Sequence, residues 1–417
     1  MILRPFRGLR PRAALAEAVA SPPYDVLNSE EARRLAEGNP NSFLHVIKPE
    51  IGLAPGIDPQ DESVYVKGAE NLRAMIHDGR MVRDEAPAYY IYRLVMDGVA
   101  QTGILGAAAV QDYLDGRIKK HEFTRPDKEQ DRIRLNDALD ATPGPIFLTY
   151  RSLPELNAVV NGQVDRPPDV DFVAPDGVSH TLWKVDDPAI CEKVESLFGS
   201  IRETYVADGH HRSAAAAKLC AERAAAIDEP SGDEPCFYFM VVHFPSDQLR
   251  VLDYNRVVKD LNGLDPETLV ARIEEVGFHV KPGWRKRKPL HRGSFGMYVA
   301  GQWFLLTAKP EIIPENDVVD RLDVSILTRC LLQPVLGIGD LRTDKRIDFV
   351  GGIRGMDELE GRVDSGNDAV AFSLWPTSLD EVMSVADAEL VMPPKSTWFE
   401  PKLRSGLVVQ LLDGDRL

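Results

Sequence analysis

The 417-residue chain carries 49 Lys and Arg residues against 65 Asp and Glu, which gives a formal net charge of −16. This acidic balance excludes broad binding to nucleic acid, because phosphate backbones require a surplus of basic side chains. Hydrophobic residues make up 44% of the chain and charged residues 27%, which excludes intrinsic disorder and predicts a globular protein with a large core.

The four cysteines have neither metal-ligand nor redox spacing, and their density is too low for a disulfide scaffold. They are Cys191, Cys220, Cys236 and Cys330. We therefore expect reduced, half-buried thiols. The N-terminal residues lack the apolar stretch of a signal peptide, and no apolar run reaches the ~18 residues of a membrane span. The sequence thus predicts a cytoplasmic protein with no membrane partner, and it leaves the oligomeric state open.

Taken in chain order, the first part of the chain alternates helices and strands. Pro22 and Pro23 exclude helix and favour an extended turn, and Asn28 with the acidic residues after it predicts a helix start. The remaining signals predict a strand at 42–47, a helix at 65–78, a hairpin at 88–110 around an Asp97-Gly98 turn, a helix at 126–139 and a strand at 146–150.

The segment 152–200 gives mixed signals, with proline pairs that mark loops. The later signals predict strands at 204–207, 236–244 and 248–252, helices at 213–226, 265–276 and 318–332, and a hairpin at 295–308 around Gly301. We expect an α+β fold with two parts. Residues 1–253 form an N-terminal α+β domain that carries a phosphate or nucleotide site, and residues 254–417 form a C-terminal α+β region.

The segment Asp208-Gly209-His210-His211-Arg212 lies between a predicted strand and a predicted helix. The first N–H groups of a helix have no internal partner, and the helix dipole makes that end positive, so a phosphate docks there readily. Gly209 lets the backbone turn tightly, Arg212 offers a fork of donors, and His210 or His211 can donate a hydrogen bond or transfer a proton. Asp208 is placed to hold a magnesium ion or to orient a histidine. The alternative is a capped helix with two surface histidines.

The charged segment 119–132 is the second candidate site. Glu122 is a candidate general base for a substrate hydroxyl. The residues placed to surround a polyphosphate are Lys119, Lys120, Arg125, Lys128 and Arg132. For the part after Pro126, a solvated helix face with local ion pairs is an equal alternative.

Two proline-stiffened loops form a third group of candidates. Pro393-Pro394-Lys395-Ser396-Thr397 presents an ammonium group and two hydroxyls, and we expect Lys395 to reach a phosphate. Pro22-Pro23-Tyr24-Asp25 is a rigid loop that lines a pocket, and a plain structural turn is the alternative for both loops. The chain has no Walker-type Gly-Lys-Ser/Thr sequence, which disfavours a P-loop kinase.

Five ordered motifs together resemble a widespread bacterial and archaeal family with a domain of unknown function, which is described as ParB-like. The motifs are Pro22-Pro23-Tyr24-Asp25, Lys119-Lys120-His121-Glu122, Asp208-Gly209-His210-His211-Arg212, Tyr254-Asn255-Arg256 and Met392-Pro393-Pro394-Lys395-Ser396-Thr397. The resemblance spans nearly the whole chain.

The segment 208–212 also resembles the phosphate-binding helix start of the ParB/sulfiredoxin-like fold, whose members include sulfiredoxin, CTP-binding ParB proteins and free-serine kinases. This resemblance implies a mixed sheet–helix core with insertions. It also implies that Glu122 acts as base and Asp208 serves the metal, as the matching residues do in the serine kinases. The chain departs from the pattern in three ways. A long insertion separates Glu122 from Asp208, no helix-turn-helix is found, and histidine stands where sulfiredoxin has its reactive cysteine.

These observations predict a nucleotide-dependent phosphotransferase that acts on a small hydroxylated metabolite, with free L-serine as the best candidate. In this hypothesis Lys119, Lys120, His121, Gly209, His211, Arg212 and Lys395 bind ATP or ADP. Asp208 places Mg²⁺, and Glu122, Asp208 and His210 carry out the chemistry. The sequence leaves two alternatives open, namely a phosphatase for a small phosphoester such as phosphoserine and a non-enzymatic nucleotide-binding switch.

Overall fold

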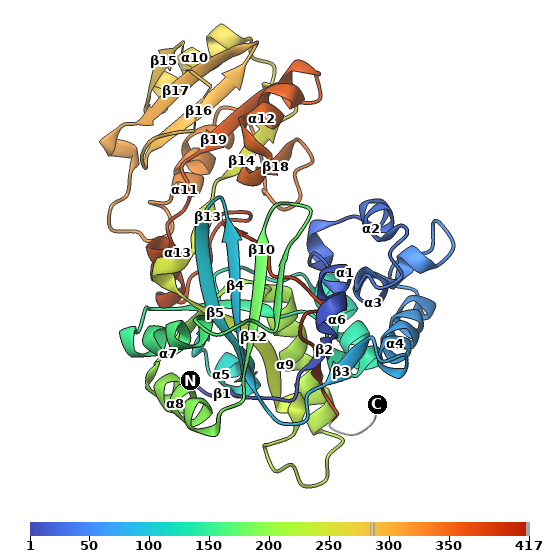
Figure 1. Cartoon of the computed structure of the whole chain (residues 1–417). Coiled ribbons are helices and arrows are strands. Elements are labelled where there is room, and N and C mark those ends of the chain that lie inside the picture. Colours follow the sequence, from blue (N-terminus) through green and yellow to red (C-terminus); the bar gives the residue numbers. More distant parts are fainter. Residues whose placement is uncertain (284, 287, 414–417) are drawn as a thin grey trace. The chain divides into compact units, whose positions relative to one another are not determined.

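The computed structural model describes residues 1–283, 285–286 and 288–413 (Figure 1). The chain divides into two compact units. The first contains Met1–Leu249 and the described residues from Pro401 onward, and the second contains Arg250–Glu400. Each unit combines helices with a sheet, which confirms the α+β class with a mixed sheet–helix core and a C-terminal α+β region. No described helix combines the length and the apolar character that a membrane span requires.

The first unit is built on a nine-stranded mixed sheet. The path across the sheet is β6 (Ile118–Lys119), β11 (Thr204–Asp208), β8 (Ile146–Tyr150), β12 (Tyr238–Pro245), β5 (Val99–Ala109), β4 (Tyr89–Met96), β10 (Ser179–Val185) and β9 (Val170–Val173), and β1 (Leu3–Arg4) pairs with β5. The pairs β6–β11 and β8–β12 are parallel, and the other pairs are antiparallel. The predicted hairpin is confirmed: Asp97 and Gly98 have φ values of 53° and 77°, which a tight turn between twisted strands requires.

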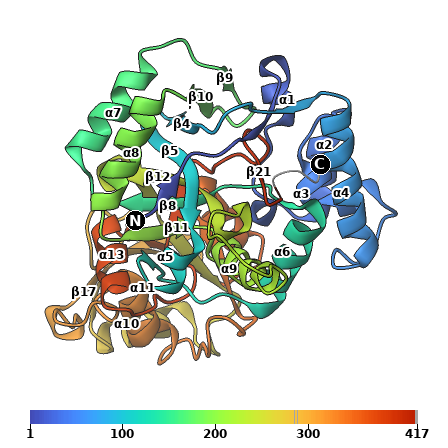
Figure 2. The same cartoon turned by 90° about the horizontal axis from the view of Figure 1, so that it is seen from below.

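Helices cover this sheet, and α9 lies among them. The helices α5 (Val110–Leu114), α7 (Pro154–Val164), α8 (Pro188–Ser200) and α9 (His210–Ala224) contribute to the apolar core of the sheet. Figure 2 shows α6 (Pro126–Leu139) beside α9. Ile133 of α6 packs there with Ala215 and Leu219 of α9. The predicted helix at 126–139 is therefore confirmed.

The N-terminal segments form a second core around Leu135 of α6. They comprise α1 (Ala16–Val19), α2 (Ser29–Ala36), α3 (Leu44–Ile47), α4 (Glu62–His77) and the paired strands β2 (Leu9–Pro11) and β3 (Met81–Arg83). The helix start at Asn28 is confirmed, because its side chain accepts a hydrogen bond from the Glu31 backbone N–H while the Glu31 carboxylate accepts one from Asn28.

The predicted strand at 42–47 is wrong, because this segment forms the short helix α3. Leu44, Val46 and Ile47 are all buried, and only His45 between them is partly exposed. A short apolar run of this kind has no period that separates a buried strand from a buried helix turn. Packing of α3 against α4 decides in favour of the helix.

The second unit contains a six-stranded sheet and four helices among its described residues. The strand order is β15 (Phe278–Pro282), β17 (Gln302–Ala308), β16 (Ser294–Val299), β19 (Val370–Leu374), β14 (Tyr254–Val258) and β18 (Ile347–Gly351). The helices are α10 (Pro266–Glu275), α11 (Asp323–Leu327), α12 (Gly355–Asp364) and α13 (Leu379–Asp387), and β13 (Arg250–Leu252) pairs with β20 (Trp398–Glu400). The predicted helix at 265–276 and the hairpin around Gly301 are confirmed.

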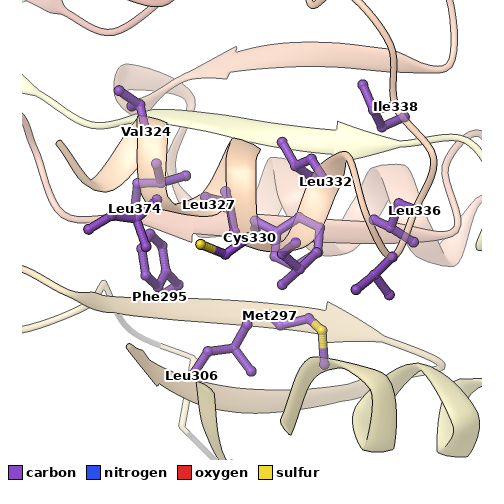
Figure 3. Packing of buried hydrophobic residues seen from close by; sticks show 14 of the residues in the cluster. Phe295, Met297, Leu306, Val324, Leu327, Cys330, Leu332, Leu336, Ile338 and Leu374 are labelled. Atoms are coloured by element: carbon purple, nitrogen blue, oxygen red, sulfur yellow. The ribbon is translucent and has the colours of Figure 1, made fainter. Parts of the chain in front are cut away.

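The helix predicted at 318–332 is wrong in its first part and irregular in its second. The Asp317 carboxylate accepts hydrogen bonds from the N–H groups of Val319 and Asp320, both at 2.8 Å, and this local turn competes with the helix. The chain becomes helical only at Asp323, and residues 328–332 form a π-helical turn. Figure 3 shows how this segment packs over the strands of the second unit.

All four cysteines are unpaired and buried, which corrects the expected half-buried state. Burial raises the pKa of each thiol. The thiols therefore remain protonated at neutral pH and behave as small apolar side chains.

The C-terminal segment is fixed to the first unit by a buried polar network. The strand β21 (Gln410–Leu411) pairs with β7 (Ala141–Thr142). Arg404, which is 7% exposed, donates to His180 Nε2 at 3.2 Å and pairs with Asp176. The Tyr92 hydroxyl accepts from the Arg404 backbone N–H at 3.3 Å. This network anchors the segment that carries Lys402 and Ser405.

We expect Arg404→Ala to lower the free energy of unfolding by about 2 kcal/mol, because it removes the side-chain donor to the buried His180 Nε2 and the ion pair with Asp176. Urea unfolding measures this change. The control is Lys67→Ala, which removes an exposed ion pair with Glu70 and should cost less than about 0.5 kcal/mol. Equal stabilities of the two variants would contradict the anchoring role.

Candidate functional site

The candidate site begins where β11 passes into α9. Gly209 caps the helix with φ 101° and ψ 30°, in the left-handed region that favours glycine. The helix expected to begin at Ser213 begins three residues earlier, at His210. The reason is that the Gly209 carbonyl accepts hydrogen bonds from both the backbone N–H and the hydroxyl of Ser213, at 2.9 and 3.0 Å.

This helix start has the properties of an anion site. Gly209 has no side chain, so no capping side chain satisfies the first N–H groups of α9. The dipole of the 15-residue helix adds a partial positive charge at the same end. A phosphate group that docks here would accept hydrogen bonds from these N–H groups and meet a favourable potential.

Asp208 is held ionised at the end of β11 by two cations. Its carboxylate lies 3.1 Å from Arg212 Nη2 and 3.7 Å from Lys402 Nζ. Burial alone would raise the pKa of Asp208, but Lys402 and Arg212 hold the pKa below its usual range. The Asp208 side chain is 26% exposed, so one carboxylate at the site remains open to a ligand or ion.

Arg212 acts as a connector rather than as a free phosphate ligand. Its Nη1 donates to the Pro145 carbonyl and its Nη2 donates to Asp208. Its Nε is buried and has no hydrogen-bond partner within the described part of the chain. The guanidinium group therefore links α9, the end of β11 and the loop before β8.

His210 is a buried neutral histidine between a second histidine and a carboxylate. The His121 backbone N–H donates to His210 Nε2 at 3.5 Å, and the two imidazole rings meet edge to face at 4.5 Å. Burial and the neighbouring His121 lower the pKa of His210 well below its usual value. Because Nε2 accepts, the proton of the neutral ring lies on Nδ1, which is 3.8 Å from Glu122 Oε2.

His121 is the most deeply buried of the polar side chains predicted at this site. It is 2% exposed, and neither ring nitrogen has a hydrogen-bond partner in the described residues. Burial lowers the pKa of His121 to about 4. A buried imidazole without a partner is costly, so a ligand or a water molecule that bonds to it gains binding energy.

The loop after β6 is fastened to the first turn of α9. The Arg125 backbone N–H donates to His211 Nε2 at 3.0 Å, and the His121 backbone N–H donates to His210 Nε2. Lys119 Nζ lies 3.7 Å from Glu203, and Lys120 Nζ lies 4.3 Å from the centre of the Tyr113 ring. The structure thus brings both predicted segments, 119–122 and 208–212, to one place.

Lys395 belongs to the second unit, where its ammonium group lies 5.8 Å from the centre of the Tyr254 ring. Lys402 and Pro145 contact the site residues and were missed by the sequence reasoning. Neither residue stands in a motif near 208–212, so no local signal identifies them. Lys402 follows soon after the last of the five motifs, which is the nearest hint in the sequence.

The described residues include no group of three or more His, Cys, Asp and Glu side chains placed to hold a metal ion. Magnesium needs fewer protein ligands, because it keeps water and takes phosphate oxygens with one or two carboxylates. Asp208, ionised and partly exposed, fits that requirement.

The chain belongs to the family described as "Protein of unknown function (DUF1015)", whose model matches residues 3–325. No curated protein matches the chain. One similar solved structure is a free serine kinase in complex with AMP, with 14% identity, a TM-score of 0.34, and coverage of 71% of this chain and 86% of that chain. Another is SbnI with a C-terminal truncation from Staphylococcus aureus, with 14% identity, a TM-score of 0.38, and coverage of 75% and 90%. A third is a conserved hypothetical protein from Pyrococcus furiosus, with 14% identity, a TM-score of 0.35, and coverage of 74% and 95%.

The neutral state of His121 gives a testable pH dependence. Its pKa is about 4 in the folded protein and about 6.5 in the unfolded chain, so the unfolded chain binds more protons between these values. The contribution of neutral His121 to the free energy of unfolding is complete above pH 6.5 and is lost as the pH falls towards 4. We expect it to fall by about 2 kcal/mol between pH 7.5 and 5.

Urea unfolding at these two pH values measures the loss, and His121→Phe should reduce the difference between them by that amount. His77→Gln, at an exposed position, is the control and should leave the difference unchanged. If the stability difference between the two pH values is the same in His121→Phe as in the wild type, folding does not lower the pKa of His121.

Proposed function

We propose that this DUF1015-family protein is a nucleotide-dependent phosphotransferase that acts on a small hydroxylated metabolite, with free L-serine as the best single candidate. The observation that carries the proposal is the juxtaposition at the start of α9. An uncapped helix end, two buried neutral histidines and the Glu122 carboxylate meet there, with 3.8 Å between His210 Nδ1 and Glu122 Oε2.

The phosphates of ATP or ADP are assigned to the turn formed by Gly209, His210, His211 and Arg212. Its N–H groups and dipole favour the anion, and the unpartnered His121 ring offers a further hydrogen bond. Lys119 ends β6 and Lys120 follows it, and the positive charge of Lys120 acts on His210. Phosphoryl transfer requires mostly positioning and neutralisation of charge, which this set supplies.

Glu122 is assigned as the general base. Its side chain is 40% exposed, so a substrate hydroxyl can reach it from solvent. The Glu122 carboxylate takes the proton of the hydroxyl, the substrate oxygen bonds to the terminal phosphorus, and the bond from that phosphorus to the nucleotide breaks. The nucleotide leaves with the bonding electron pair. His210 Nδ1 lies 3.8 Å from this carboxylate, which is beyond direct hydrogen-bond distance.

Asp208 is assigned to the magnesium ion that accompanies the nucleotide. Arg212 and Lys402 keep this carboxylate ionised, which suits a hard cation. The ion would neutralise phosphate charge when bound. Arg212 positions Asp208 through the bond from Nη2 and holds the neighbouring chain through Pro145.

We expect Arg212→Lys to weaken ADP binding in the presence of magnesium by tenfold or more. The variant keeps the charge but cannot hold Pro145 and Asp208 at the same time with one planar fork. Calorimetric titration measures the affinity. Arg223→Lys is the matched control, because Arg223 lies at the other end of the same helix. If ADP does not bind to the wild-type protein, the assignment of a nucleotide site is overturned.

We expect Glu122→Gln to lower ATP-dependent phosphorylation of serine by about 10²- to 10⁴-fold, the usual contribution of a general base, with ADP affinity changed less than twofold. Phosphoserine formation is measured directly. Glu222→Gln, at an exposed position of α9, is the control. Full activity in Glu122→Gln would remove the base assignment.

The same assays separate the alternatives. Release of phosphate from phosphoserine without nucleotide would replace the kinase by a phosphatase. Tight nucleotide binding with no turnover of any hydroxylated acceptor would replace it by a nucleotide-binding switch.

A further inference from the structure

A small pocket opens beside Arg212, apart from the helix start. Its empty volume, counted together with the open solvent at its mouth, is about 390 Å³, and the enclosed part is small. Its polar lining comes from Tyr24, Arg132, Asn136, Thr142, Arg212 and Ser405. These residues belong to five separate segments of the first unit, so the pocket exists only in the folded chain.

Three of these polar side chains belong to largely buried residues. Asn136 is 6% exposed, and Thr142 and Ser405 are each 4% exposed. Within the described residues, none of the three has a side-chain hydrogen bond, although all three line the pocket. These amide and hydroxyl groups line the pocket and can bond to a polar ligand there.

The pocket is also positive. Arg132 lies over the Tyr24 ring at 3.9 Å, and its Nε and Nη2 pair with Asp131. Its Nη1 has no hydrogen bond in the part of the chain that the structure describes. Arg212 contributes a second guanidinium group, paired with Asp208 on one side. Burial raises the pKa of Tyr24 to about 12, so its hydroxyl remains a neutral donor.

We propose that this pocket binds the carboxylate of a small amino acid or hydroxy acid, which is the acceptor of the phosphoryl group. Arg132 offers the carboxylate a charged donor through Nη1, because its Nε and Nη2 are bound to Asp131. Arg212, held by Pro145 and Asp208, adds positive charge beside it. The Asn136 amide and the Thr142 and Ser405 hydroxyls match the remaining lone pairs and an α-ammonium group. The role as acceptor subsite rests on the proposed function, whereas carboxylate binding by the pocket does not.

Arg212 joins this pocket to the helix start. It lines the pocket and donates to Asp208 at 3.1 Å. A carboxylate in the pocket would therefore place the rest of a small acid within reach of Asp208 and the segment 209–212. This arrangement selects acids with a hydroxyl close to the carboxylate over simple alcohols.

Gly144 provides a sharp test, because a methyl group there would enter the pocket. A Cβ atom at Gly144 would lie 2.8 Å from Ser405 Oγ and 3.9 Å from Arg212 Nη1. The φ angle of Gly144 is not positive, so alanine causes no backbone strain there and its only cost is steric. Gly199→Ala is the matched control, because a Cβ atom there meets nothing within 4 Å.

The experiment is calorimetric titration of the full chain with L-serine, acetate and inorganic phosphate, and separately with ADP. We expect serine to bind the wild type, acetate to compete with it, and Gly144→Ala to weaken serine binding by tenfold or more. ADP affinity should change less than twofold in Gly144→Ala, and Gly199→Ala should match the wild type. Asn136→Leu should reproduce the loss, and it replaces Gly144→Ala if that variant does not fold.

Serine affinity equal in wild type, Gly144→Ala and Asn136→Leu would overturn the pocket assignment, as would phosphate displacing serine where acetate does not. Carboxylate binding that depends on Gly144 in a protein that binds no nucleotide would overturn the proposed phosphotransferase and leave the pocket assignment standing. Nucleotide binding in a protein whose serine affinity does not depend on Gly144 would overturn the pocket assignment and leave the proposed phosphotransferase standing.

Discussion

The parallel pairing of β6 with β11 is the constraint on which the candidate site depends. Thr204 is paired with Ile118, and Tyr205 with Lys119. Parallel neighbours leave the sheet at the same edge, so the loop after Lys119 and the turn after Asp208 must meet there. The hydrogen bonds from the loop backbone to His210 and His211 follow from this meeting. An antiparallel arrangement would send the two segments to opposite ends of the strands.

Burial then sets the chemistry of the groups that meet. His121 and His210 lose their protons at neutral pH because the surroundings disfavour the charged ring. Asp208 keeps its charge in the same region because Lys402 and Arg212 lie beside it. Neutral donors next to a fixed carboxylate and an uncapped helix end form a site that favours an anion accompanied by a cation.

The C-terminal segment completes both the helix start and the carboxylate pocket. Arg404 fixes this segment through His180 and Tyr92, while Lys402 faces Asp208 and Ser405 lines the pocket. The first unit is therefore made from the two ends of the chain. The candidate site combines residues that stand far apart in the sequence, and one buried polar network holds the C-terminal segment among them.

The sequence by itself determined the features that depend on neighbouring residues. These features are the α+β class, the Asp97-Gly98 hairpin, the helix at 126–139 and the passage from strand to helix at Gly209, and all follow from local periodicity and turn chemistry. Only the tertiary structure decided the rest. It made 44–47 a helix and brought Lys402 and Pro145 to the motif. These outcomes depend on contacts between distant segments, whose free energy no short stretch of sequence encodes.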